Sequence, residues 1–440
     1  MLELKRSLRV RDGLAMVVGI MVGTGIFRTP GPVAAQLGRP TLTLLVWFLG
    51  GVIALAGSLI FAELATRLPR AGGKYVYANE AFGTRAGFLV GWVEGVAIYT
   101  VAIGGIGVVS GEYLGRLLGA PDRAGALGVA LVALFTGINL IGVASGRRVQ
   151  NLSTAAKLLG LGVVIVAALA RGQGAGWHDS LSRAPQQGGA ALAAALAVAF
   201  QAVIWTYYGY LDAGKIAEEV VEPGRNLPRI FLGGIAIATT LYLLLNVAYL
   251  QVLPFETIAR SNLVAADVMA ALFGSRAGAV FAALALLVVL ASLNGNIFVT
   301  PRVIFGLARE RLAPRALARV NAGGTPWVAM TFVGVTAMVL AATGTFESLL
   351  ALSITLILVV DSIAVLALLV LRRRTPEAPF HAPFSQVLPL GFVAVYGALF
   401  VGTVLAQPKV VLVSLGVLGM AYILSWISTS SQSDRQGLRG

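Results

Sequence analysis

The stretch that decides the fold is GIMVGTGIFRTPG, residues 19–31, within the first long apolar segment of the chain. Gly23, Gly25, Pro30 and Gly31 interrupt a run that is otherwise apolar enough to cross a membrane. Glycine leaves the backbone free to unwind, and proline removes a hydrogen-bond donor. Inside a bilayer, unwound backbone is tolerated only where it is buried in protein or lines a cavity. The stretch therefore predicts either a broken helix beside a cavity or close helix packing through small residues.

A second interruption lies at VIWTYYGYLDAGKIAEEV, residues 203–220, where aromatic and polar residues end an apolar run. Asp212 and Lys215 would stand near membrane depth, which is costly for a continuous helix that faces lipid. We therefore predict that this helix is broken as well.

The composition supports a membrane protein. Of the 440 residues, 58% are hydrophobic and 12% are charged, and the mean hydropathy is +0.86. Soluble domains average about 45–50% apolar and about 25% charged residues, so a soluble globular enzyme is excluded. The chain has no cysteine, which excludes disulfides, thiolate metal sites and a disulfide-linked subunit.

Twelve apolar segments follow one another along the chain, and a helical span needs roughly 20 apolar residues. We predict an all-α integral membrane protein with twelve transmembrane helices. The longest connecting loops are expected near 67–85, 171–188 and 254–276. The predicted segments cover residues 12–36, 41–66, 86–115, 124–144, 151–170, 189–217, 230–253, 277–308, 326–345, 348–371, 388–406 and 410–428.

The net charge of +14 comes from clusters of Lys and Arg between the apolar segments, and these clusters form no single basic face of the kind that binds nucleic acid. If the N-terminus lies inside, 24 of the 33 basic residues fall on the inner side and 9 on the outer side. By the positive-inside rule both termini are cytoplasmic and the protein lies in the cell (inner) membrane. The basic start MLELKRSLRVRDG resembles a signal peptide but lacks a small-residue cleavage site, so we expect an uncleaved first span.

The two interrupted segments are the first and the sixth, five apart. This spacing suits two inverted five-helix repeats of the LeuT type, with broken helices 1 and 6. We expect the first repeat over residues 1–171, the second over 189–371, and two additional helices over 388–428.

Such breaks predict how a ligand is held. The second half of a broken helix offers free N–H groups to an anion, and the first half offers free carbonyls to a cation. Backbone at Gly23, Thr24 and Gly25 would hold a carboxylate, and carbonyls near Met21 and Trp205 would hold an ammonium group. A zwitterionic amino acid carries both groups. No nucleotide-binding GxxxxGK[ST] motif accompanies the breaks, and we expect no cofactor and no metal.

Four motifs in order resemble the amino acid–polyamine–organocation (APC) transporter superfamily. They are GIMVGTGIF (19–27), PRAGGKYVYANEAFG (69–83), EEVVEPGRNLPR (218–229) and SLNGNIFVTPRVIFGLARERLAP (292–314). Ser-Leu-Asn-Gly at 292–295 and Gly-Trp-Val-Glu at 91–94 are most similar to bacterial relatives of the light subunits of heteromeric amino-acid transporters. In that family a cysteine ties the light subunit to a glycoprotein, so the absence of cysteine implies a stand-alone protein.

The resemblance implies roles for individual residues. Met21, Gly23, Thr24 and Gly25 would contact the substrate, and Trp205 would be an aromatic gate that closes over it. Packing in the core or at the lipid interface is the alternative for Trp205. Tyr208 stands where many relatives have a small residue, so it would narrow the pocket against large aromatic substrates.

Lys157 lies where relatives have a lysine in place of the sodium ion of LeuT-like transporters. Its ammonium would tie the fifth helix to the first and would make transport sodium-independent. As a buried lysine it is also a candidate to couple transport to protons, by accepting a transported proton. The alternative is a lysine that snorkels to the membrane interface.

Four further ionisable residues stand in or near the predicted spans. Glu94 is expected to be structural, and Asp212 is either a solvating group at the helix break or a pocket acid. Asp361 has no partner that the sequence assigns. Lys74 replaces the acidic or small residue expected in the family, and the sequence gives no role for it.

We therefore expect a sodium-independent secondary transporter of amino acids by alternating access. Neutral amino acids are the expected substrates, and they would be carried by exchange or by proton symport. A cationic amino acid, agmatine or a polyamine is the alternative, because Asp212 and the aromatic residues at 205–210 could accept a cation. A sensor that binds without transport belongs to a different class, and the sequence lacks a signalling domain for it. An intramembrane enzyme is disfavoured because Asp212 and Asp361 are single acids on distant segments.

Overall fold

The computed structural model describes residues 6, 8–70, 72–141, 147–177, 189–215, 217–309, 313–321 and 325–437. Within these ranges the fold is all-helical, and the only β pairing is an isolated bridge between Leu8 and Val220. The predicted all-α class is confirmed.

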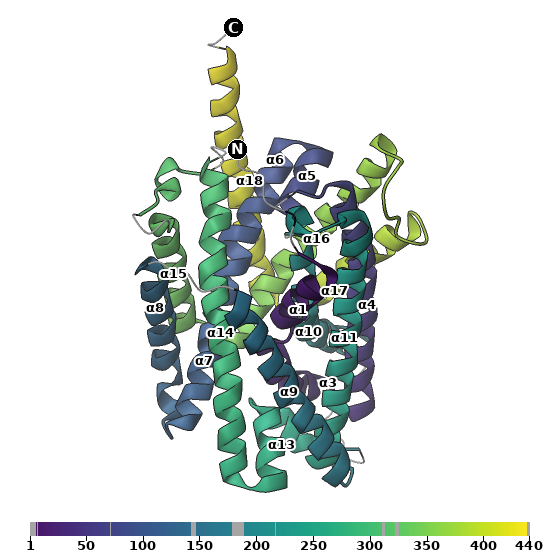
Figure 1. Cartoon of the computed structure of the whole chain (residues 1–440), viewed down its shortest axis with the longest axis vertical. Coiled ribbons are helices and arrows are strands. Elements are labelled where there is room, and N and C mark those ends of the chain that lie inside the picture. Colours follow the sequence, from purple (N-terminus) through teal and green to yellow (C-terminus); the bar gives the residue numbers. More distant parts are fainter. Residues whose placement is uncertain are drawn as a thin grey trace.

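The helices form a bundle in which most long helices run roughly along the vertical of Figure 1. Their bounds are α1 Val10–Met21, α2 Thr24–Arg28, α3 Pro30–Leu37, α4 Pro40–Arg67, α5 Lys74–Phe82, α6 Thr84–Trp92, η1 Val93–Ile98, α7 Tyr99–Leu117, η2 Pro121–Arg123, α8 Ala124–Ile141, α9 Arg147–Arg171, α10 Gly189–Tyr207, η3 Tyr208–Gly214, η4 Ala217–Glu219, α11 Pro223–Val252, α12 Phe255–Arg260, α13 Val264–Phe273, α14 Ser275–Arg309, η5 Arg315–Ala318, α15 Trp327–Thr343, α16 Phe346–Arg374, α17 Val387–Ala406 and α18 Pro408–Gly437.

Ten helical stretches in the described ranges are long and apolar enough to cross a membrane. In hydrocarbon every backbone polar group must be satisfied internally, which is why long apolar segments form helices. The other two predicted segments coincide with α9 and with α15, whose 17 residues make it a shorter apolar helix. The count of twelve spans stays a prediction.

Two of the predicted loops are wrong in part. Residues 67–85 contain α5, and residues 254–276 contain α12 and α13. These helices have 9, 6 and 10 residues, too few to give the long apolar signal on which the prediction depended. Most of the third predicted loop, residues 178–188, lies outside the described residues.

Both predicted helix breaks are present. α1 ends at Met21, and Val22 (φ −76°, ψ 76°) and Gly23 (φ −129°, ψ −146°) separate it from α2. The sixth segment is α-helical only to Tyr207 and continues as the 3₁₀ helix η3. α1 packs against η3, α9 and α11, so the two breaks lie together in the bundle.

The two ends of the bundle are distinct. α5 and α6 lie at one end, where the chain also runs out along α18, and α13 lies at the opposite end (Figure 1). We call these the α5 end and the α13 end.

Candidate functional site

A cavity of about 90 Å³ lies between the two helix breaks. It is lined by residues of α1, α2, η1, α7, α10, η3 and α14, which bring four distant parts of the chain together. All six residues predicted to contact the substrate, Met21, Gly23, Thr24, Gly25, Trp205 and Tyr208, are among its walls. The remaining lining residues are Ile20, Ile98, Tyr99, Ala102, Ile106, Thr206, Gly209, Asp212, Ser292 and Asn296.

The two breaks approach each other so closely that only glycine fits at the contact. A Cβ atom on Gly25 would lie 2.8 Å from the Cα of Thr206, and one on Gly209 would lie 2.8 Å from the amide nitrogen of Met21. Real Cβ atoms do not approach backbone this closely, so a side chain would force the helices apart. The glycines therefore bring the two breaks together.

The first break presents backbone to the cavity. The first N–H groups of a helix have no partner within it, so the start of α2 at Thr24 and Gly25 carries partial positive charge. Gly23 has little room for a side chain, since a Cβ would lie 3.3 Å from the Ile20 carbonyl oxygen. An anionic group can therefore approach the main chain here.

The carbonyl side of this break is partly occupied. The Met21 carbonyl accepts hydrogen bonds from the Gly23 N–H (2.8 Å) and from the Tyr242 hydroxyl (2.7 Å). A carbonyl has two lone pairs, so the Met21 oxygen is satisfied without a ligand. Ile20, which also lines the cavity, offers the neighbouring carbonyl, to which the described residues supply no donor.

Lys157 does not line the cavity but supports it from behind. Its side chain is buried, and its Nζ donates to the Gly19 carbonyl at 3.2 Å. The lysine thus ties α9 to the last turn of α1, one turn from the break. This internal contact favours the predicted link between helices over a lysine that snorkels to the interface.

The second break contributes side chains to the cavity wall. Trp205, Tyr208 and Asp212 come from the end of α10 and from η3, and all three line the cavity. In a 3₁₀ helix, residues three apart lie on the same side, which places Asp212 on the same side of η3 as Gly209, another residue of the cavity wall. Of the two roles expected for Asp212, its position in the wall favours the pocket acid.

Five charged residues form a group beside the cavity, at the α5 end, and we call this group the lysine cluster. Its members are Lys74, Glu94, Asp212, Lys215 and Asp361, of which Asp212 also lines the cavity. Lys74 Nζ lies 2.8 Å from Asp361 Oδ1 and 3.2 Å from Glu94 Oε1. Lys215 Nζ lies 2.5 Å from Asp212 Oδ1 and 4.0 Å from Glu94 Oε1. The two residues that the sequence left unexplained, Lys74 and Asp361, are partners.

Lys74 is the centre of this cluster. Its side chain is 4% exposed, and that of Asp361 is fully buried. Burial alone would lower the pKa of Lys74, but the carboxylates of Asp361 and Glu94 raise it above the usual value. The ammonium is therefore charged at neutral pH.

A second ionic group lies towards the α13 end, and we call it the arginine cluster: Arg28, Glu112 and Glu347. Arg28 Nε lies 2.8 Å from Glu112 Oε2, and its Nη2 lies 2.7 Å from Glu347 Oε1. The cluster joins α2 to α7 and α16. Its acids reach solvent, since the Glu347 side chain is 52% exposed.

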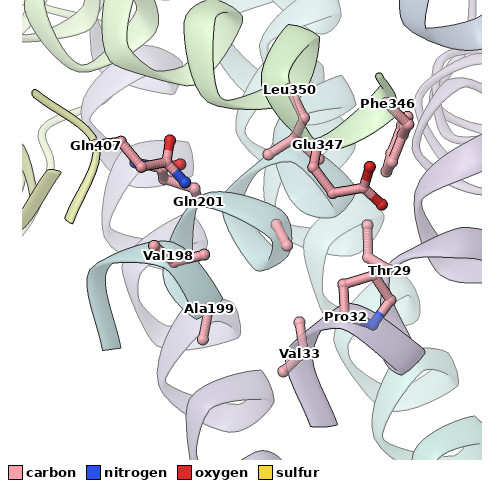
Figure 2. A pocket seen from close by; sticks show the side chains of 11 residues that line it. Thr29, Pro32, Val33, Val198, Ala199, Gln201, Phe346, Glu347, Leu350 and Gln407 are labelled. Carbon is pink, nitrogen blue, oxygen red and sulfur yellow. The ribbon is translucent and has the colours of Figure 1, made fainter. Parts of the chain in front are cut away.

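A smaller cavity of about 50 Å³ adjoins the arginine cluster. Figure 2 shows Glu347 and Thr29 on one side of it and Gln201 and Gln407 on the other. It contains neither helix break nor any of the predicted substrate contacts. The cavity between the breaks is therefore the candidate binding site.

Sequence reasoning missed four polar residues of the cavity wall: Tyr99, Thr206, Ser292 and Asn296. The last two stand one turn apart on α14, and the SLNGN stretch was noted only as a family motif. Polar residues at this spacing in an apolar helix were the signal that could have found them.

A scan against protein families matches the amino acid permease model over residues 10–429. The chain is 31% identical over 408 residues to the serine/threonine exchanger SteT of Bacillus subtilis, covering 90% of each chain. It is 28% identical to the large neutral amino acids transporter small subunit 2 of Rattus norvegicus, covering 94% of this chain and 79% of that one. It is also 28% identical to the human b(0,+)-type amino acid transporter 1, covering 92% of this chain and 84% of that one.

Proposed function

Because this chain belongs to the amino acid permease family, we propose that it exchanges neutral amino acids without sodium, by alternating access. The chain is a multi-pass membrane transporter of amino acids and not an enzyme. The proposal covers its binding site, its substrate class, its mode of coupling and its arrangement in the membrane.

The observation that carries the proposal is the cavity between the two breaks. The N–H groups of Thr24 and Gly25 bind the substrate carboxylate, beside Gly23, whose own N–H donates to the Met21 carbonyl. The carbonyls of Ile20 and Trp205 accept from the ammonium group of the substrate. These two groups are common to all amino acids, so the first break recognises the substrate class. Tyr208, Asp212, Ser292 and Asn296 then surround the variable side chain.

Trp205 acts as the gate. It lies at the wall of the cavity where α10 turns into η3, so a small rotation at the break moves its ring across the substrate. Tyr208 limits the room beside it, and a cavity of about 90 Å³ suits a small or medium side chain.

The Lys157 ammonium holds the last turn of α1 where a LeuT-like transporter would bind sodium. Its contact with the Gly19 carbonyl at 3.2 Å supports this role, since a cation is needed at the carbonyl end of a broken helix. We infer that transport is independent of sodium. Its relative SteT is named a serine/threonine exchanger, which favours exchange over proton symport for this chain.

The proposal includes the arrangement of the chain. Twelve spans form two inverted repeats, residues 1–171 and 189–371, followed by two helices over 388–428. Both termini lie on the cytoplasmic side of the inner membrane, which the charge bias supports. The α5 end is then cytoplasmic and the α13 end external.

Proteoliposomes test the proposed function. Labelled threonine, leucine and arginine are offered without sodium to empty vesicles, to vesicles preloaded with the same amino acid, and to vesicles with an inward proton gradient. We expect uptake of the neutral amino acids into preloaded vesicles alone. Uptake driven by the proton gradient into empty vesicles would replace exchange by symport. Uptake that is absent under these conditions and appears only after sodium is added would contradict the role of Lys157. Binding without any flux would identify a sensor.

A further inference from the structure

The lysine cluster raises a question that the proposed function leaves open. A transporter cavity with an acid in its wall and two tyrosines beside it has the groups that would bind a cationic side chain. In this chain those groups are already in contact with the chain's own ammonium groups.

The first cation receptor is the pair of carboxylates behind Tyr208. Asp361 and Glu94 come from α16 and η1 and converge on Lys74, at 2.8 and 3.2 Å from its Nζ. The same ammonium donates to the Tyr208 hydroxyl, which itself lies 3.4 Å from Asp361 Oδ1. Lys74 therefore stands directly behind a residue of the cavity wall.

The second cation receptor is Asp212 with Tyr99, both in the cavity wall. Lys215 Nζ lies 2.5 Å from Asp212 Oδ1 and 4.1 Å from the ring centre of Tyr99. The Tyr99 hydroxyl donates to Glu94 Oε1 at 3.2 Å, which links this receptor to the first one.

We propose that Lys74 and Lys215 determine substrate specificity by occupying, with tethered ammonium groups, an acidic subsite that would otherwise accept a cationic side chain. This inference rests on the proposed function and identifies the residues that determine its substrate specificity. An arginine or lysine substrate would have to displace a tethered ammonium group from its carboxylate partners. A neutral side chain leaves these ion pairs intact.

The balance of charges explains why Lys74 matters most. The cluster holds three carboxylates and two ammonium groups, so its formal charge is −1 when all are ionised. Loss of Lys74 would change it to −2 and would leave two buried carboxylates, Glu94 and Asp361, without their main partner. An uncompensated buried charge is strongly unfavourable, and a long cationic side chain from the cavity could relieve it.

The test is the ratio of arginine to threonine exchange in the proteoliposomes described above. For Lys74→Met we expect this ratio to rise by roughly tenfold or more, which corresponds to about 1.4 kcal/mol. Lys74→Arg keeps the charge and should keep the wild-type ratio. Lys409→Met removes an exposed lysine at the start of α18 and serves as the matched control.

The double variant Lys74→Met/Asp361→Asn separates charge from packing. It removes one ammonium and one carboxylate, so the formal charge returns to −1 and the arginine ratio should fall back towards that of the wild type. A merely structural role of Lys74 would reduce exchange of both amino acids and leave their ratio unchanged. If the ratio of arginine to threonine exchange stays raised in the double variant, the proposal is wrong.

Lys215→Met provides a second route if Lys74→Met does not fold. Lys215 and Asp212 are each about a quarter exposed, at 24% and 25%, so the loss of this lysine is less damaging to the fold. It should also raise the arginine ratio, and an unchanged ratio would contradict the proposal.

Failure of the proposed function is distinguishable from failure of this inference. If the wild type exchanges no amino acid, the proposed function is wrong, and arginine binding to wild type and Lys74→Met is then compared by the shift in Tm. If the wild type exchanges threonine but accepts arginine equally well, the proposed function of exchange stands and the specificity role of Lys74 is wrong.

Discussion

The two helix breaks that form the cavity differ in what they present to it. The first break, Met21 to Thr24, exposes main chain and has a glycine, Gly23, where a Cβ would crowd the Ile20 carbonyl oxygen at 3.3 Å. The second break, from Trp205 to Asp212, exposes two large aromatic rings and a carboxylate. Main chain can recognise only what all amino acids share, whereas side chains can distinguish one substrate from another.

This difference suggests that the two helix breaks have separate roles in substrate binding. Changes at the first break should affect every substrate alike, because they alter the recognition of the carboxylate and ammonium groups. Changes at the second break should alter the gate or the choice of substrate. The following variants test that division, in order of decreasing effect.

Gly25→Ala should have the largest effect overall, because it impairs both the binding and the flux of every substrate. The new Cβ would lie 2.8 Å from the Thr206 Cα, which forces α2 away from α10. We expect exchange of every substrate to fall by at least about tenfold, or about 1.4 kcal/mol, with no change in substrate ratios. Gly397→Ala on α17, where a Cβ meets nothing within 4 Å, is the matched control. A change in the relative rates at which different substrates are exchanged would contradict the assignment of shared recognition to the first break.

Trp205→Ala should abolish flux while the protein still folds and binds substrate. The ring is the proposed gate at the second break, so its loss should affect closure more than the recognition of the carboxylate. Flux is measured by exchange and binding by the shift in Tm. Trp205→Phe should restore part of the flux, and unchanged transport in Trp205→Ala would contradict the gate.

Lys157→Ala should reduce exchange of all substrates equally. Its ammonium supports the Gly19 carbonyl at 3.2 Å, so its removal loosens the first break and leaves the second untouched. Rates are measured from pH 5 to 9 for threonine and leucine. Wild-type rates across this range would remove Lys157 from the mechanism.

Tyr208→Ala should have the smallest effect on rate and the clearest effect on size selection. Removal of the ring enlarges the cavity, so tryptophan and phenylalanine should compete better for threonine uptake by a few-fold, within the roughly 1–3 kcal/mol that pocket size confers. Tyr208→Phe keeps the ring volume and should keep the wild-type preference. Equal competition by aromatic amino acids in all three proteins would show that Tyr208 does not limit the pocket.

The sequence predicted those features that depend on neighbouring residues. Glycines at 23 and 25 predicted the first break, and aromatic and polar residues at 205–212 predicted the second, because backbone freedom and polarity are local properties. The short helices α5 and α13 were missed for the same reason, since their apolar runs are too brief to be recognised.

The lysine cluster could not be predicted in this way. Lys74 and Asp361 are 287 residues apart in the chain, and their meeting depends on how α5 packs against α16. Each residue alone was an unexplained charge near an apolar segment. Only the fold shows that each one compensates the other.

The central claim is that the substrate lies between the breaks, with its backbone groups on the first and its side chain on the second. A cryo-electron microscopy structure with bound threonine tests it most directly. We predict density in the cavity, with the carboxylate at the amides of Thr24 and Gly25 and the side chain directed to Tyr208 and Asp212. Density in the smaller cavity beside Glu347, or a substrate bound in the reverse orientation, would contradict it.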